Sequence, residues 1–147
     1  MNTEELRIML ERGIAIEAAV AAMSSSICAP NKSNPYAAPG LVYEPVENGM
    51  GFKVRLHGLA IVPKYEQVKD GEGQFPALFG RITLCFADDE GYPGKPLLKI
   101  LINPRGHFSL DGTKNFDYGI GEDVLDHARL RLSLTIAEAV QAEIPIL

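Results

Sequence analysis

The sequence predicts a single α+β domain, residues 1–147, in which an antiparallel sheet of four or five strands packs one face against an N-terminal and a C-terminal helix. Three observations lead to this fold. Apolar residues recur at helical spacing near both ends of the chain, two hairpin signals separate short alternating segments in its middle, and 147 residues suit one domain. The composition, 46% hydrophobic and 22% charged, is that of a globular protein.

The N-terminal helix is predicted from residue 3 to about residue 26. Glu5 places an acidic side chain in the first turn, where the helix dipole favours it. Gly13 weakens the middle of the helix. The segment 28–40 contains three prolines and is predicted to be a loop. The apolar positions that recur at helical spacing are Leu6, Met9, Leu10, Gly13, Ile14 and Ala21, and on a second line Ile16, Val20 and Met23.

The dipeptide Asn48-Gly49 predicts the first hairpin, because it suits a two-residue type I′ turn. That turn would place Glu44 opposite Lys53 as a cross-strand ion pair. It also sorts the side chains by character, with Leu41, Tyr43, Phe52, Val54 and Leu56 on one face and Glu44, Lys53 and Arg55 on the other. Near His57-Gly58 the apolar alternation changes phase, which predicts a β-bulge.

Residues 63–76 are polar and are predicted to be a long loop, followed by a strand over 78–87 and another over 97–102. The stretch 103–112, NPRGHFSLDG, gathers side chains that could suggest catalysis. However, its first four residues predict a type I turn closed by a left-handed Gly106. In that hairpin Ile102 faces Phe108 and Lys99 faces Asp111, so no catalytic residue is assigned there.

The C-terminal segment fits two patterns. One helix over 122–142 explains an apolar stripe at helical spacing and is the favoured interpretation. The alternative is a strand over 128–134, where leucines alternate with polar residues, followed by a short helix capped by Thr135 and Glu138.

Several classes of function are disfavoured. The net charge of −5 argues against a general nucleic-acid-binding protein. The two cysteines have no metal-binding spacing, which argues against zinc and fits a reducing, cytoplasmic compartment. The N-terminal segment lacks the features of a signal peptide, and no membrane span is expected. No nucleotide loop or nucleophile motif is complete, so we expect no metal or cofactor, and the sequence leaves open whether the protein is an enzyme.

A cationic sheet face is the strongest functional candidate. The polar side of the predicted strands collects Lys53, Arg55, His57, Arg81, Thr83, Lys99, His107 and Ser109 against Glu44 and Asp111. Such a face on an acidic protein could engage an acidic protein partner or an anionic ligand. The sequence therefore predicts a soluble binding or adaptor protein, with binding residues Lys53, Arg55, His57, Arg81 and His107.

Two other functions are compatible with the sequence. One is binding or conversion of a small molecule in a pocket between sheet and helices, lined by Tyr43, His57, Arg81 and His107. The other is assembly as a homodimer.

Overall fold

The computed structural model describes residues 1–29, 40–73 and 75–147. Most of the predicted loop over 28–40 therefore lies outside the described residues. The elements follow one another as α1 (Thr3–Cys28), β1 (Val42–Pro45), β2 (Phe52–Leu56), β3 (Leu59–Asp70), β4 (Ala77–Ala87), β5 (Pro93–Ile102), β6 (Phe108–Ser109) and α2 (Glu122–Glu143). The α+β class and both terminal helices are confirmed; the described part of the sheet has six strands rather than four or five.

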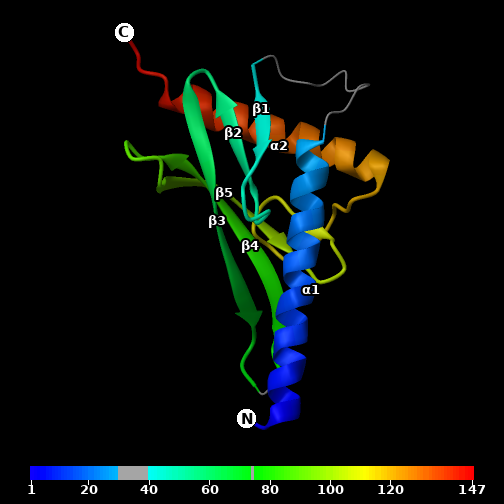
Figure 1. Cartoon of the computed structure of the whole chain (residues 1–147). Helices are drawn as coiled ribbons and strands as arrows, with labels where there is room; N and C mark the ends of the chain where they lie inside the picture. Colours follow the sequence, from blue (N-terminus) through cyan, green and yellow to red (C-terminus); the bar gives the residue numbers. More distant parts are fainter. Residues whose placement is uncertain (30–39, 74) are drawn as a thin grey trace.

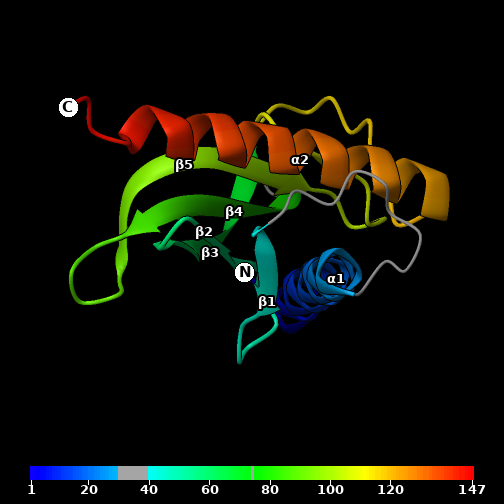
Figure 2. The same ribbon diagram turned by 90° about the horizontal axis from the view of Figure 1, so that it is seen from above.

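The six described strands form one antiparallel meander in chain order, from β1 at one edge to β6 at the other. In Figure 1, α1 runs beside the long β3–β4 hairpin, and α2 lies crosswise near the end of α1. Figure 2 shows α2 passing over β5 and β4. Both helices share one hydrophobic core with one face of the sheet, and its largest fully buried side chains include Phe52, Phe108, Ile16, Met23, Ile82 and Ile100.

The close approach of α1 to the sheet depends on Gly80 in β4. A Cβ atom at this position would lie 2.8 Å from Cγ2 of Val20 and 3.1 Å from Cγ2 of Ile16. The helix therefore packs against the sheet at Gly80, because any side chain there would push α1 away. The N-terminus of α1 is fixed by a capping box between Asn2 and Glu5.

The register of the first hairpin is confirmed, but its predicted turn is wrong. Glu44 lies opposite Lys53 and Tyr43 opposite Val54, as the alternation of side chains predicts, but the predicted ion pair between Glu44 and Lys53 is wrong, because Glu44 forms its ion pair with Arg55. The strands end at Pro45 and Phe52, so residues 46–51 form the connection, in which the backbone N–H of Gly49 donates to the carbonyl of Val46. The register survives because the burial of alternate side chains specifies it independently of the turn.

The prediction of a loop over 63–76 is wrong, because most of this segment belongs to β3. This strand pairs with β4 continuously from Ile61 opposite Phe86 to Asp70 opposite Ala77. The predicted bulge at His57-Gly58 is also wrong. Leu56 pairs directly with Leu59, and the two residues between them, with φ of 52° and 79°, form a tight hairpin turn.

The second hairpin has the predicted turn. The N–H of Gly106 donates to the carbonyl of Asn103 at 3.0 Å, Gly106 has φ of 84°, and Ile102 pairs with Phe108. Beyond β6 the predicted pairing is wrong. Asp111 accepts hydrogen bonds from the backbone and hydroxyl of Thr113, and no ion pair joins it to Lys99 in the described residues.

The C-terminal segment is one helix, α2, so the favoured interpretation is confirmed over the strand alternative. Its buried side is formed by Leu125, Ala128, Arg129, Leu132, Ser133, Ile136 and Val140. Arg129 is only 8% exposed, and its guanidinium donates to the carbonyls of Ser26 and Ala29 at the end of α1. This contact joins the two helices directly.

Candidate functional site: the outer face of the sheet

The outer face is the side of the sheet that points away from both helices. Because side chains alternate along a strand, residues next in sequence to core residues such as Val54, Ile82 and Ile100 lie on it. The charged residues of the strands on the outer face are Glu44, Lys53, Arg55, Lys64, Glu66, Asp70, Arg81 and Lys99. Five cations thus oppose three carboxylates, of which Asp70 pairs with Lys114, on a protein whose net charge is −5.

Two of the outer-face cations have carboxylate partners. Arg81 donates to Oε1 of Glu66 through Nε at 2.9 Å and through a terminal nitrogen at 2.6 Å. The hydrogen bond from Arg81, followed by the charges of Lys64 and Lys99, lowers the pKa of Glu66. Arg55 forms an ion pair with Glu44, with its Nε atom 3.4 Å from Oε1 of the carboxylate.

Three lysines carry the remaining charge of the outer face. Lys53, Lys64 and Lys99 are exposed, and none forms an ion pair with a residue that the structure describes. Lys64 and Lys99 flank Thr83 in one cross-strand row. With neighbouring strands about 4.8 Å apart, their Cα atoms are separated by about 10 Å. We call Lys53, Lys64 and Lys99 the lysine cluster.

The structure separates the five binding residues predicted from the sequence. Lys53 and Arg55 lie on the outer face at β2, and Arg81 lies on it at β4. His57 is in the β2–β3 turn at the end of this face. His107 belongs to the β5–β6 hairpin at the opposite edge, where its ring packs beside Gly119.

Lys64 was missed by sequence reasoning because its segment was interpreted as a loop. The signal that could have found it is the density of β-branched and aromatic residues in that segment, namely Ile61, Val62, Tyr65 and Val68.

One part of the outer face is covered by the segment between β6 and α2. The hydroxyl of Ser109 donates to the carbonyl of Thr113 at 2.6 Å, and Lys114 forms an ion pair with Asp70 at 2.9 Å. The ring of Phe116 lies 5.5 Å from that of Phe79. Lys53 on β2 and Lys64 on β3 make none of these contacts, whereas Lys99 on β5 lies beside Gly112 of this segment, where an added Cβ atom would be 3.1 Å from Cβ of Lys99.

The predicted pocket lined by Tyr43, His57, Arg81 and His107 is not formed by these residues. Tyr43 points toward the helices, and its hydroxyl lies 2.8 Å from Oγ of Ser133. Burial raises the pKa of Tyr43 to about 12. Arg81 is on the opposite face of the sheet, so the two side chains cannot line one cavity.

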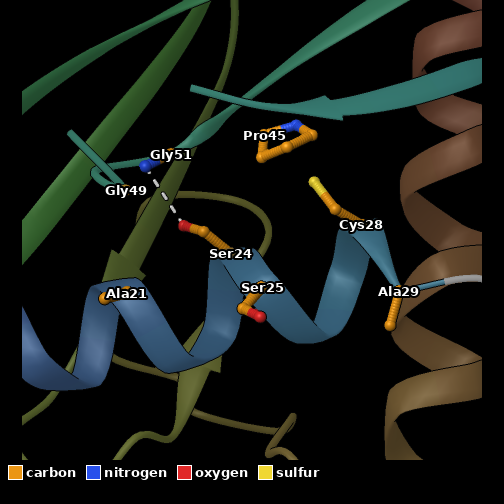
Figure 3. A pocket seen from close by; sticks show the side chains of 8 residues that line it. All are labelled: Ala21, Ser24, Ser25, Cys28, Ala29, Pro45, Gly49 and Gly51. Carbon is orange, nitrogen blue, oxygen red and sulfur yellow. Dashed lines mark hydrogen bonds between the residues drawn. The ribbon is translucent and has the colours of Figure 1, made fainter. Parts of the chain in front are cut away.

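A different cavity, of about 280 Å³, lies between the end of α1 and the connection 46–51 (Figure 3). Its described lining is mostly small or apolar: Ala21, Ser24, Ser25, Cys28, Ala29, Pro45, Gly49 and Gly51. Ser24 is engaged, because its hydroxyl accepts the N–H of Gly51 at 3.1 Å. Burial raises the pKa of the Cys28 thiol, against a smaller lowering by the charge of Arg129. The cavity lacks a carboxylate or imidazole among these residues, so they offer no acid–base pair for catalysis.

Within the described residues, no helix is long and apolar enough to cross a membrane, and no group of three or more His, Cys, Asp or Glu side chains could hold a metal ion. Comparison with known protein families, curated proteins and solved structures finds no match.

Proposed function

We propose that this protein is a binding protein that engages an acidic protein partner through the lysine cluster. The observation that supports the proposal is the exposure of Lys53, Lys64 and Lys99, without carboxylate partners in the described residues, on the sheet face that the helices leave open. Such a patch on a protein of net charge −5 steers a partner of opposite charge to one face and repels it from the rest.

The shape of the outer face favours a protein partner over a small molecule. The lysine cluster spreads over strands β2, β3 and β5 instead of converging on one point. Val42, which is 48% exposed on the edge strand β1, adds an apolar contact beside Arg55. A sheet face with exposed charges around small apolar contacts resembles the rim and core of a transient protein interface.

The test compares two triple variants of equal charge. Lys53→Glu/Lys64→Glu/Lys99→Glu reverses the lysine cluster, and Lys69→Glu/Arg105→Glu/Arg131→Glu reverses three exposed cations outside it that form no ion pair with a described residue. Both triple variants change the net charge by the same amount. Partners captured from a lysate of the source cells by the wild-type protein are identified, and their association rates are measured at low and at moderate salt.

We expect the first variant to slow association by at least about tenfold at low salt and to remove its salt dependence, while the second retains both. Equal effects of the two variants would refute the proposal, since net charge alone would then explain the result. A thermal-shift screen against anionic metabolites tests the other ligand class. Stabilisation by a metabolite that the first variant abolishes would assign the lysine cluster to a small anion instead.

A further inference from the structure

One edge of strand β3 is unpaired over much of its length among the described strands. β3 pairs with β4 over residues 61–70, whereas its pairing with β2 covers only Leu59, Ala60 and Ile61. In Figure 1, the lower part of β3 has β4 on one side and no strand on the other. Such an open edge presents backbone N–H and C=O groups that can pair with a strand of another chain.

The turn between β2 and β3 determines which backbone groups face the open edge. Leu59 follows a two-residue turn, and in such a hairpin the residues on either side of the turn exchange both of their hydrogen bonds. The direction of hydrogen bonding alternates along a strand, so Pro63 and then Tyr65, Gln67 and Lys69 point the same way as Leu59. Pro63 has no N–H, which gives a physical reason for β2 to stop pairing there. The three residues after it direct their N–H and C=O groups toward the open edge.

We propose that a second copy of this chain adds antiparallel to this edge and forms a homodimer with Gln67 on the twofold axis. Gln67 then pairs with its own copy and Tyr65 with Lys69 of the other copy, so that the outward N–H groups form six hydrogen bonds in all. Lys64 lies opposite Asp70 of the other copy, and the twofold symmetry repeats this contact. Because Lys64 has no carboxylate partner among the described residues, unlike charges meet at both ends of the paired segment.

The sequence of the open edge favours this register over its neighbours. Residues directly opposite on two antiparallel strands share a face of the sheet, so the twofold axis passes through one residue and its own copy. An axis at Val68 would set Glu66 against Asp70, and an axis at Tyr65 would pair Gln67 with a proline, which has no N–H. Four other positions would set a charged side chain against itself: Lys64, Glu66, Lys69 and Asp70. Within 64–70, an axis at Gln67 is the one that keeps every hydrogen bond and sets unlike charges opposite each other.

Two exposed side chains of α1 border the same edge. Gly13 lies close to the proposed axis, because its carbonyl accepts a hydrogen bond from the side-chain amide of Gln67 at 3.2 Å. On one flank of Gly13, Arg12 donates to a carbonyl just before β4 at 3.2 Å. Leu10 and Ile14 occupy the other flank, toward the open edge, and are 60% and 66% exposed. The second copy therefore covers apolar surface as well as backbone groups.

The number of these contacts limits the strength of the dimer. Six backbone hydrogen bonds and two ion pairs lie within the range of about 5–15 direct hydrogen bonds found in specific protein interfaces. The paired segment, residues 64–70, is about 24 Å long at about 3.4 Å per residue, which makes the contact small. We therefore expect a dissociation constant in the micromolar range.

The dimer does not depend on the proposed function, although both use Lys64. Asp70 already pairs with Lys114 of its own chain at 2.9 Å, and its carboxylate has lone pairs for a second lysine. Lys53 and Lys99, the other members of the lysine cluster, lie on β2 and β5, away from the open edge of β3. A change at Asp70 therefore disturbs the dimer and leaves the lysine cluster intact, whereas a change at Lys53 does the opposite.

The test is sedimentation equilibrium of the full chain at low salt over a range of micromolar concentrations. Lys64→Asp sets two carboxylates opposite each other at both ends of the paired segment, and Asp70→Lys sets two ammonium groups there. Each variant alone raises the dissociation constant by at least about tenfold. An equimolar mixture of the two variants associates with wild-type affinity, because unlike charges again lie opposite each other. Lys53→Asp, which makes the same charge change on the same face, is the matched control and leaves the constant unchanged.

A second pair of variants tests the backbone pairing. Lys69→Pro removes an outward N–H, and thus two of the hydrogen bonds across the axis, without removing a bond to β4. Lys69→Thr keeps the N–H and favours a strand. The proline variant raises the dissociation constant by at least about tenfold and the threonine variant by less than about threefold, while circular dichroism checks that both are folded.

Three results would overturn the inference. The first is a wild-type protein that stays monomeric throughout the concentration range. The second is a mixture of Lys64→Asp and Asp70→Lys that fails to associate. The third is a threonine variant at Lys69 that weakens the dimer as much as the proline variant, since the side chain and not the backbone would then hold the copies together.

Discussion

Arg129 is the residue whose replacement tests the architecture most directly. Its guanidinium, 8% exposed, donates to the carbonyls of Ser26 and Ala29, which α1 itself leaves without helical donors. Asp126 lies 3.7 Å from the same group. Arg129→Met keeps the length of the side chain but removes the charge and the donors, so the partly buried hydrogen bonds to the carbonyls of Ser26 and Ala29 are lost.

The expected loss follows from these contacts. A hydrogen bond from a charged donor contributes about 1.5–3 kcal/mol, and a cation at a partly buried helix C-terminus contributes up to about 2 kcal/mol. Because water can replace part of the lost bonding, we expect Arg129→Met to lower the free energy of unfolding by about 3–4 kcal/mol. With a urea dependence of about 2 kcal/mol per molar, the unfolding midpoint shifts down by about 1.5–2 M.

The measurement is urea unfolding followed by circular dichroism. Arg129→Lys keeps the charge but not the planar fork of donors, so we expect a smaller loss. Arg131→Met, two residues further along α2 at an exposed position, is the control and should change the free energy by less than about 0.5 kcal/mol. A loss below about 1 kcal/mol for Arg129→Met would show that the guanidinium does not hold the two helices together.

Two further predictions concern the interior. Gly80→Ala should lower the free energy of unfolding by about 1–3 kcal/mol, because the new Cβ atom would lie 2.8 Å from Cγ2 of Val20. Gly13→Ala should raise it by up to about 1 kcal/mol, because its Cβ atom would meet only the side chain of Gln67, at 3.4 Å. Urea unfolding measures both, and equal effects of the two variants would contradict the packing at Gly80. The second prediction concerns the difference in free energy of unfolding between the wild-type protein and Tyr43→Phe. Because folding raises the pKa of Tyr43 from 10.0 to about 12, this difference should be constant below pH 10 and fall by about 3 kcal/mol between pH 10 and 12. A difference that does not change with pH would contradict this.

The predictions that succeeded rest on patterns with a physical cause inside a short segment. Alternation in β1 and β2 specified their register, since a slip by one residue would expose Phe52 and Val54 and bury Lys53. The turn at Asn103 followed from local chemistry, because Gly106 accepts a positive φ at little cost. Neither argument needed knowledge of distant parts of the chain.

The failure at β3 has the opposite origin. From Lys64 onward β3 is polar and also contains Glu66 and Lys69, so its composition favours a loop. The strand forms because ten consecutive residues, 61–70, pair with β4, and because the side-chain amide of Gln67 donates to the carbonyl of Gly13 in α1 at 3.2 Å. Both contacts are made with residues outside the segment, so the propensities of its own residues do not predict them.

The candidate site was predictable only in part for the same reason. Assigning side chains to faces placed Lys53, Arg55, Arg81 and Lys99 together correctly. Omitting β3 removed both Lys64, which strengthens the site, and Glu66, which neutralises Arg81. Which cations remain available to a partner depends on the neighbouring strand, and that information appears only when the sheet is assembled.

The neighbours of the lysine cluster give a physical reason for lysine at these positions of the outer face. Val62, Thr83 and Cys85 lie on that face and are 8%, 7% and 3% exposed, although they are outside the core cluster shared by the helices. Lys64 lies opposite Thr83. Lys53 directly precedes Val54, which lies opposite Ile61, so Lys53 shares a cross-strand row with Val62. Lysine stems can cover such apolar surface while their ammonium groups stay in water. The same side chains thus shield the sheet and present its positive charge, which lets an acidic protein keep a cationic face without exposing an apolar one.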